Sequence, residues 1–421
     1  MNWRRHSKAQ IDKNIEEALE QNVNFYEDLA MGVPASHLDG EEFASNSQIL
    51  EGSTYLKTLV ANPNHIGVHT DDTDSENFFS GTQKLEAEVI RVIGEDILRA
   101  QTDTVDGYVS SGGTEGNIQA LWTYRNYYRK KFNLGKDYSS VGVICSADSH
   151  YSFDKGADLL NLHIFKVEVD QNTRRIQQES LSQQIKNCKT HGVDKIILIC
   201  NMMTTMFGSV DDLDDYWNQL STENFEIKVH VDGAYGGFLY PFTVTDQKLN
   251  FKDDRITSFS LDAHKMLQAP YGTGLFLIRK GNLHYTLTDT AQYVSGMDCT
   301  LIGSRSGANA IAVYKILFNY EPFDWKEKVD RLAYRTNMLA THLSNLKIKF
   351  IHFEGSNIIT IHKNFITSEI SSKYGLVPDN HHDPSWYKIV IMDHVRGDKI
   401  RKFLEDLYDH HSIAFQPLVF P

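Results

Sequence analysis

The chain has 421 residues, of which 41% are hydrophobic and 23% charged, a composition typical of globular proteins with a large buried core. Its formal net charge of -13 argues against nucleic acid or an anionic membrane as a partner. No apolar run follows the basic N-terminal residues, and the four cysteines form no Cys-x-x-Cys pair. We therefore expect no secretory signal, no membrane span and reduced thiols, as in a cytoplasmic protein.

Three units are expected along the chain. Residues 1–55 carry only weak helical periodicity and cannot form a core, so they are predicted to be an arm over the main body or a partner subunit. Strands alternate with helices from about 105 to 280, which predicts an α/β domain with a mostly parallel sheet covered on both faces. We place this large domain at residues 56–305 and a smaller α+β domain at 306–421.

The first motif with chemical content is Gly107-Tyr-Val-Ser-Ser-Gly-Gly-Thr-Glu-Gly-Asn117, which leads into a predicted long helix. Its paired glycines, the second being Gly113, leave backbone N–H groups uncovered at a helix start, where the dipole also favours an anion. Thr114 adds a hydroxyl that can cap this helix. No Gly-Lys-Ser/Thr follows, so nucleotide hydrolysis is disfavoured. The motif predicts a phosphate site, although a Gly-Gly turn by itself is more often only a turn.

Two further strands end in polar residues. A short apolar strand over 141–145 is followed by His150, whose flat imidazole can stack on an aromatic ring. Taken alone, such a histidine is more often a cap or a core residue. The strand over 196–200 ends in Asn201-Met-Met-Thr-Thr205, and its two threonines can donate hydrogen bonds into the same cleft.

A carboxylate and a lysine follow the next two strands. Asp232 comes directly after an apolar strand over 226–231, a costly position unless the carboxylate is paired, and a pyridinium nitrogen is one such partner. The alternative is an aspartate that caps a helix or a turn. The strand over 256–261 delivers Lys265 ahead of a Gly-bearing turn, which suits a Schiff-base lysine that meets a cofactor aldehyde. An isolated lysine at a strand end is ordinarily a surface residue.

The coincidence of these positions carries more weight than any one of them. In mostly parallel sheets, ligands bind beyond the carboxyl ends of the strands. One phosphate loop, one stacking imidazole, one carboxylate and one lysine at such ends predict a site for pyridoxal 5'-phosphate (PLP). The residues concerned are Gly113, His150, Thr205, Asp232 and Lys265.

These motifs, together with Gly303-Ser-Arg-Ser-Gly307, resemble those of the PLP-dependent group II amino-acid decarboxylases, in the same order from about residue 60 onward. Within the group, the chain is most similar to the bacterial histidine decarboxylase and plant serine decarboxylase type. The resemblance implies the aspartate-aminotransferase-like type I fold, with a mostly parallel seven-stranded sheet, and a homodimer with active sites at its interface. It also implies α-decarboxylation of an L-amino acid, with histidine slightly favoured over serine, aspartate and aromatic amino acids.

The resemblance further implies a role for each matching residue. Lys265 is the Schiff-base lysine and Asp232 the partner of the pyridine nitrogen. His150 stacks on one face of the cofactor ring and Ala234 packs against the other. The remaining matches are Gly113, Thr114 and His264 near the phosphate, Thr204 or Thr205 near the ring, and Ser304 reaching across the dimer interface.

The chain also departs from these relatives. Asp262-Ala-His-Lys265 stands where histidine and serine decarboxylases have Ser-Gly-His-Lys, which bears on the substrate rather than on the chemistry. The mobile loop of the aromatic amino-acid decarboxylases is short or absent between 284 and 303, which leaves Tyr293 as the candidate proton donor. Aldol cleavage, β-elimination and transamination use the same groups and stay as alternatives, and a non-catalytic protein of this fold is least expected. No metal is expected.

Overall fold

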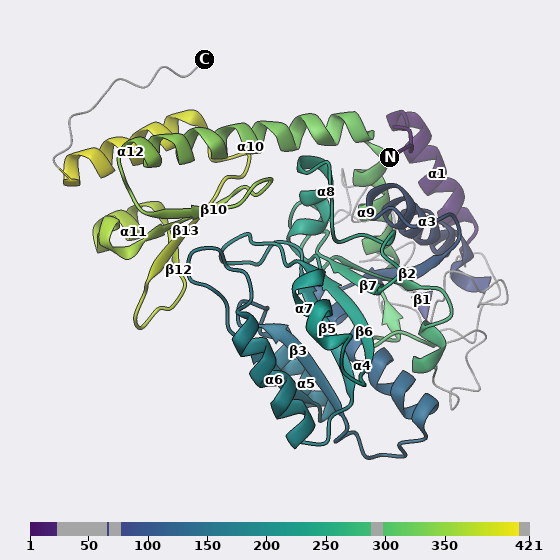
Figure 1. The fold of residues 1–421 in the computed structure, drawn as a ribbon. Helices are drawn as coiled ribbons and strands as arrows, with labels where there is room; N and C mark the ends of the chain where they lie inside the picture. Colours follow the sequence, from purple (N-terminus) through teal and green to yellow (C-terminus); the bar gives the residue numbers. More distant parts are fainter. Residues whose placement is uncertain (23–64, 67–76, 288–297, 412–421) are drawn as a thin grey trace.

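The computed structural model describes residues 1–22, 65–66, 77–287 and 298–411. It has two lobes, each built on its own sheet, and one long helix extends along both (Figure 1). Within the described part of the chain, no helix is long and apolar enough to cross a membrane. All four cysteines are buried free thiols, as expected.

A seven-stranded sheet in the order β2-β8-β7-β6-β5-β3-β4 forms the centre of the large lobe. β8 (Gly274–Arg279) runs against both of its neighbours, and the other six strands are parallel to one another. The predicted mostly parallel sheet is therefore confirmed. The six parallel strands are β2 (Val105–Ser110), β3 (Val141–Ser146), β4 (His163–Val167), β5 (Lys195–Asn201), β6 (Glu226–Asp232) and β7 (Ile256–Leu261).

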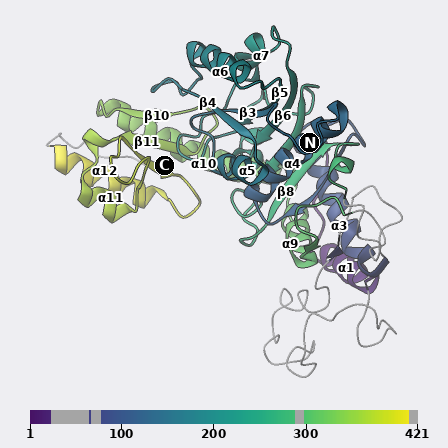
Figure 2. The ribbon, with the colours of Figure 1, turned by 90° about the horizontal axis from the view of Figure 1, so that it is seen from below.

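Helices bury both faces of this sheet. Successive side chains of a strand point to opposite faces, so Val143 and Ile197 pack in the apolar layer of α4 and α5, whereas Ile144 and Leu198 pack in the layer of α3, α6, α7 and α9. Figure 2 shows α6 and α7 at one end of the sheet and α1, α3 and α9 at the other. The helices are α1 (Lys8–Glu20), α3 (Ser80–Arg91), α4 (Gly113–Phe132), α5 (Ser152–Leu160), α6 (Gln178–Thr190), α7 (Leu213–Leu220), α8 (Tyr240–Thr243) and α9 (Gly307–Phe318).

The described part of the N-terminal arm lies on the large lobe of its own chain. α1 packs against α3 and α9, Ser7 caps it by accepting the N–H of Gln10, and the indole of Trp3 donates to the Tyr320 carbonyl at 2.9 Å. The boundary expected at residue 55 lies outside the described residues, and the division into three domains stays a prediction.

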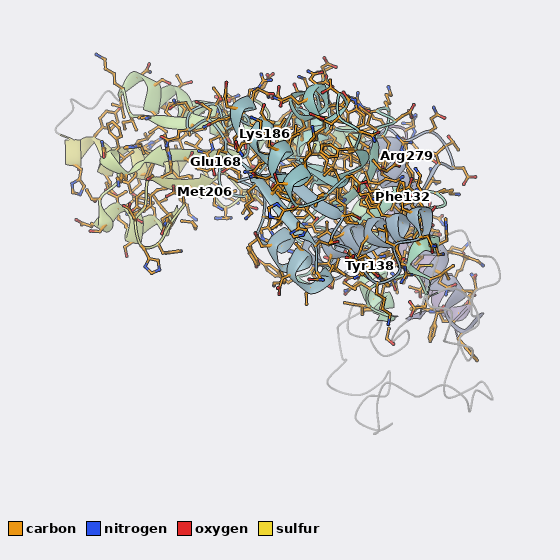
Figure 3. All side chains as sticks on the ribbon, turned by 60° about the horizontal axis from the view of Figure 1, so that its bottom comes forward. Phe132, Tyr138, Glu168, Lys186, Met206 and Arg279 are labelled. Carbon is orange, nitrogen blue, oxygen red and sulfur yellow. The ribbon has the colours of Figure 1, made fainter. Side chains whose placement is uncertain are left out.

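The small lobe is a four-stranded antiparallel sheet in the order β10-β11-β13-β12. α10 (Pro322–Asn345) begins with a proline after a capping box at Glu321 and reaches from one lobe to the other (Figure 1). Phe207 packs on Ile351 and Trp386 where the lobes meet, beside Met206 (Figure 3). The other elements here are β10 (Phe350–His352), β11 (Ile358–His362), α11 (Ser368–Tyr374), β12 (Val377–Pro378), β13 (Trp386–Val390) and α12 (Gly397–His411).

Short elements complete the chain. α3 passes at Arg91 into a π-helical segment, η3 (Val92–Ile97). Such segments insert one extra residue per turn, which 3.6-residue periodicity does not reveal. The rest are β1 (His65–Ile66) paired with β9 (Ser304–Arg305), and the single turns η2 (Asn77–Phe79), η4 (Gly236–Phe238), η5 (Leu283–Thr286) and η6 (Lys363–Phe365).

Candidate active site

A cavity of about 270 Å³ lies at the carboxyl ends of the parallel strands. Five segments that are far apart in the sequence line it, and each comes from the end of a different strand. A larger cavity of about 600 Å³ between α1, α9 and α10 contains none of the predicted site residues, so size alone does not locate the chemistry. The lining segments of the smaller cavity are drawn from residues 111–117, 148–151, 201–205, 232–235 and 262–265.

The N-terminus of α4 forms one wall of this cavity. Gly112 precedes the helix with a φ of +148°, a conformation that other residues rarely adopt. A Cβ on Gly113 would lie 2.9 Å from the Cβ of Ala234, so glycine permits the close approach of these two segments. Thr114 lies in the first turn, and Gly112 occupies the cap without a side-chain hydrogen bond. The predicted capping by Thr114 is therefore wrong.

Lys265 and the start of α4 are joined by one carboxylate. The Asp262 Oδ2 atom lies 2.8 Å from Lys265 Nζ, and Asp262 Oδ1 accepts the Gly113 N–H at 2.5 Å. His264 lies beside them, with Nε2 3.8 Å from Asp262 Oδ2. Because His264 Nδ1 lies 2.8 Å from the Thr273 carbonyl, which can only accept, the proton of a neutral ring is on Nδ1.

Asp232 is buried at the end of β6, where both of its oxygens are hydrogen-bonded. Oδ1 accepts the Ala234 N–H and Oδ2 accepts from Asn117 Nδ2, each at 3.0 Å. Burial raises the pKa of this carboxyl, and the hydrogen bonds and the charge of Lys265 act in the opposite direction. A cationic partner in the cavity would therefore favour its ionised form.

His150 faces the cavity from the loop after β3. Its Nδ1 lies 2.9 Å from Ser152 Oγ and accepts the Ser152 N–H at 3.3 Å. Burial lowers the pKa of the imidazole, so the ring is neutral near neutral pH. Its ring is tilted by 39° against that of Tyr151, with the ring centroids 4.2 Å apart.

The structure separates the remaining predicted residues. Thr204 is buried with its hydroxyl 2.8 Å from Ser209 Oγ, whereas Thr205 is exposed at the cavity rim. Ser304 is exposed on β9 and does not line the cavity of its own chain. Tyr293 lies outside the described residues.

Sequence reasoning missed four contributors to this site. Lys388 on β13 reaches from the small lobe and donates to the Thr205 carbonyl at 3.0 Å. Burial, and then the nearby charge of Lys265, lower the pKa of Lys388. A lysine in an ordinary strand carries no sequence signal for this contact. The other three are Asn117, Ser152 and His230, whose bonds to the site depend on how α4 crosses the sheet.

Comparison with known proteins decides the family. The sequence profile of the pyridoxal-dependent decarboxylase conserved domain matches residues 81–313. A tryptophan decarboxylase from Clostridium sporogenes is 44% identical over 406 residues, which cover 96% of this chain and 97% of the relative. The chain belongs to the pyridoxal-dependent decarboxylase family. It is a PLP-dependent decarboxylase of L-amino acids.

Other relatives of this decarboxylase support the same assignment. A probable L-tyrosine/L-aspartate decarboxylase from Methanocella arvoryzae is 30% identical, covering 84% of this chain and 92% of the relative. The L-methionine decarboxylase structure from Streptomyces sp. 590 matches with a TM-score of 0.68 at 17% identity, over 95% and 93% of the two chains. The structure of Lactobacillus brevis glutamate decarboxylase matches with a TM-score of 0.67 at 16% identity, over 100% of this chain and 96% of the other. These structures confirm the type I fold, whereas the expected likeness to histidine and serine decarboxylases is not supported.

The residues of the cavity fit PLP, the cofactor of this family. The N-terminus of a 20-residue helix favours an anion, and the Asp262 carboxylate already accepts the Gly113 N–H there. The primary amine of Lys265 matches an aldehyde, and the buried carboxylate of Asp232 matches a protonated ring nitrogen. Each reactive group of the cofactor thus has a chemical counterpart within one cavity.

Proposed function

We propose that this decarboxylase acts on an aromatic L-amino acid, with L-tryptophan as the first candidate. The observation that carries the proposal is the 44% identity, over nearly the whole chain, with a protein named tryptophan decarboxylase. Two tyrosines at the cavity support an aromatic side chain in the substrate. Tyr151 and Tyr235 both line the cavity.

Lys265 and Asp232 are assigned the two principal tasks. When bound, PLP supplies a conjugated ring that takes up the electron pair left by departing CO2. Lys265 would hold the cofactor covalently through its aldehyde, and its amine would be the group that frees the product. Asp232 faces the ring nitrogen and keeps it protonated, and a hydrogen bond of this charged kind is worth roughly 1.5–3 kcal/mol.

The other cavity residues position the cofactor in this proposal. His150 stacks on one face of the ring, and Ala234 packs against the other. Thr205 is favoured over Thr204 as the hydroxyl near the ring, because the Thr204 hydroxyl is already bonded to Ser209. The phosphate is assigned to Gly113, Thr114 and His264.

A homodimer completes the proposal. Ser304 is exposed and outside the cavity of its own chain, which is consistent with a contact to the site of a partner subunit. Tyr293 stays the candidate donor of the proton to Cα. The mass of the native protein in solution tests the dimer, and a monomer that retains full activity would exclude this role for Ser304.

The substrate is tested by offering the purified protein, with added PLP, each L-amino acid separately and identifying the products by mass spectrometry. We expect tryptamine from L-tryptophan as the most rapidly formed amine. Histamine as the main product would return the substrate to histidine. A keto acid, aldehyde or ammonia without CO2 would contradict decarboxylation as the main reaction.

A further inference from the structure

Asn117, on α4, is 1% exposed and contacts four polar groups. Its Nδ2 lies 3.0 Å from Asp232 Oδ2 and 2.9 Å from Ser152 Oγ. Its Oδ1 accepts from His230 Nε2 at 3.0 Å and from the Ser260 hydroxyl. A side-chain amide has two N–H donors and two acceptor lone pairs, so every hydrogen-bonding position of Asn117 is used.

The carboxylate of Asp232 fixes the orientation of this amide. An ionised carboxylate can only accept, so the nitrogen of Asn117 faces Asp232 and the oxygen faces His230. His230 must then donate from Nε2, because an amide oxygen only accepts. Burial lowers the pKa of His230 to about 3, so its ring is neutral and Nδ1 carries no proton.

The chain of donors continues into the core. The unprotonated Nδ1 of His230 accepts from Ser258 Oγ at 2.7 Å, and the Ser258 hydroxyl therefore accepts from the hydroxyl of Tyr124. All three side chains are fully buried. From Tyr124 through Ser258, His230 and Asn117, every group donates in the direction of Asp232. Aligned donors polarise one another and favour the ionised form of the terminal carboxylate.

The same amide sets the proton of His150. Because Ser152 Oγ accepts from Asn117, its hydroxyl proton is left to point at His150 Nδ1, 2.9 Å away. The Ser152 backbone N–H, which can only donate, also points at this atom. His150 Nδ1 is therefore an acceptor, and the proton of its neutral ring is on Nε2.

We propose that Asn117 is a positioning residue that, oriented by His230, keeps Asp232 ionised and places the proton of His150 on Nε2. The part that concerns Asp232 rests on its proposed role toward the ring nitrogen of PLP. His230, Ser258 and Tyr124 do not line the cavity, and their hydrogen bonds lead to the site through Asn117.

Nitrogen NMR of the holoenzyme tests this directly. The protein is prepared with ¹⁵N in its histidines and loaded with PLP that carries ¹⁵N in the ring. In Asn117→Leu, the ring-nitrogen signal should move from pyridinium toward neutral pyridine. The equilibrium between these proton positions should change by roughly 10- to 100-fold, as expected for losing a hydrogen bond to a charged group. His150 should show a mixture of tautomers instead of one.

Gln119→Leu is the matched control. Gln119 is a buried amide on the same helix, but it bonds to Tyr108, Thr286 and the Cys299 carbonyl rather than to Asp232 or Ser152. Both nitrogen signals should stay as in the wild type. If they change as much as in Asn117→Leu, the effect comes from disturbing α4 and the proposal is wrong.

Two milder changes keep the test valid if Asn117→Leu does not fold. Ser258→Ala removes one hydroxyl but leaves Asn117 Oδ1 to accept from Nε2, so His230 should keep its single tautomer, and two tautomers in this variant would contradict the proposal. His230→Gln can still donate to Asn117 and accept from Ser258, so it should keep the wild-type ring-nitrogen signal, whereas His230→Leu should lose it. Equal signals in these two His230 variants would overturn the proposal.

Asp232→Asn distinguishes the proposed role of Asp232 toward the ring nitrogen from the positioning role of Asn117. If it neutralises the ring nitrogen while Asn117→Leu leaves both signals unchanged, Asp232 has its proposed role and only the positioning by Asn117 is wrong. If the ring nitrogen stays protonated in Asp232→Asn as well, the proposed role of Asp232 fails together with this inference.

Discussion

The Asp262 carboxylate accepts the backbone N–H of Gly113 at 2.5 Å, although 149 residues separate the two in the chain. A negative charge thus lies at the helix N-terminus that we assign to the phosphate of PLP. The other oxygen of Asp262 is 2.8 Å from the amine of Lys265. The same carboxylate therefore contacts both groups that the cofactor must engage.

Removing the charge of Asp262 should tighten cofactor binding. Two unit charges about 4 Å apart repel by about 4 kcal/mol at an effective dielectric constant of about 20. Relief of only one third of this repulsion would strengthen binding about tenfold. In Asp262→Asn, an amide oxygen can still accept the Gly113 N–H without a charge. We expect the Kd of PLP, measured by fluorescence titration, to fall about tenfold or more.

Asp154→Asn is the control for this measurement. Asp154 on α5 pairs with Lys166 at 2.7 Å and does not line the cavity, so the same loss of charge there should leave PLP affinity unchanged. An unchanged affinity in Asp262→Asn would show that the charge of Asp262 does not oppose binding, and a weaker affinity would show that Asp262 helps to bind the cofactor.

A methyl group on Gly113 should disturb the cofactor site by contact with Ala234. The added Cβ would lie 2.9 Å from the Cβ of Ala234 and 3.3 Å from both oxygens of Asp262, and overpacking of this kind costs about 1–3 kcal/mol. Gly113→Ala should therefore weaken PLP binding by roughly tenfold or more. Ala234→Gly added to it should recover part of the loss, and no recovery in the double variant would locate the clash elsewhere.

His230 should make the fold sensitive to acid. Burial lowers its pKa to about 3 in the folded protein, whereas a histidine in the unfolded chain titrates near about 6.5. Between these values the unfolded state binds one more proton, so the free energy of unfolding falls as the pH falls, by about 1.4 kcal/mol per pH unit. Above this range His230 is neutral in both states and contributes no pH dependence.

His230→Gln should remove this contribution while keeping a donor and an acceptor in place. We measure the free energy of unfolding in urea between about pH 4 and about pH 7. Its slope against pH should be smaller than in the wild type by the contribution of one bound proton. The wild-type protein, measured at the same pH values, is the reference. An identical slope in the two proteins would show that His230 is not buried neutral.

Strand ends were predictable because buried strands are short apolar runs followed by polar residues. The strand predicted over 256–261 has the bounds of β7 in the structure, and Lys265 follows it into the cavity as expected. What lies beside each residue was not predictable in the same way. His230 bonds to Ser258 because their positions pair in the register of β6 and β7. Asn117 bonds to His230 on β6 and to Ser260 on β7 because α4 crosses those strands.

Two further features have no local sequence signal. Ser304 lies outside the cavity of its own chain, so its proposed contact depends on a second subunit. The Asp262 pairing with Gly113 depends on the close approach of β2 and β7 on either side of β8. The resemblance in motif order slightly favoured histidine, whereas the 44% identical relative is named tryptophan decarboxylase. The motifs that we assign to the cofactor leave the substrate side chain undefined.

The most direct measurement is to locate the covalent attachment of PLP. The holoenzyme is reduced with borohydride and digested, and the peptide that carries the pyridoxyl group is identified by mass spectrometry. We predict the modification on Lys265 in the wild type and none in Lys265→Ala, which should also lose turnover. Lys388 is a second lysine near the cavity rim, and a pyridoxyl group on Lys388, or full activity in Lys265→Ala, would contradict the assignment of this site.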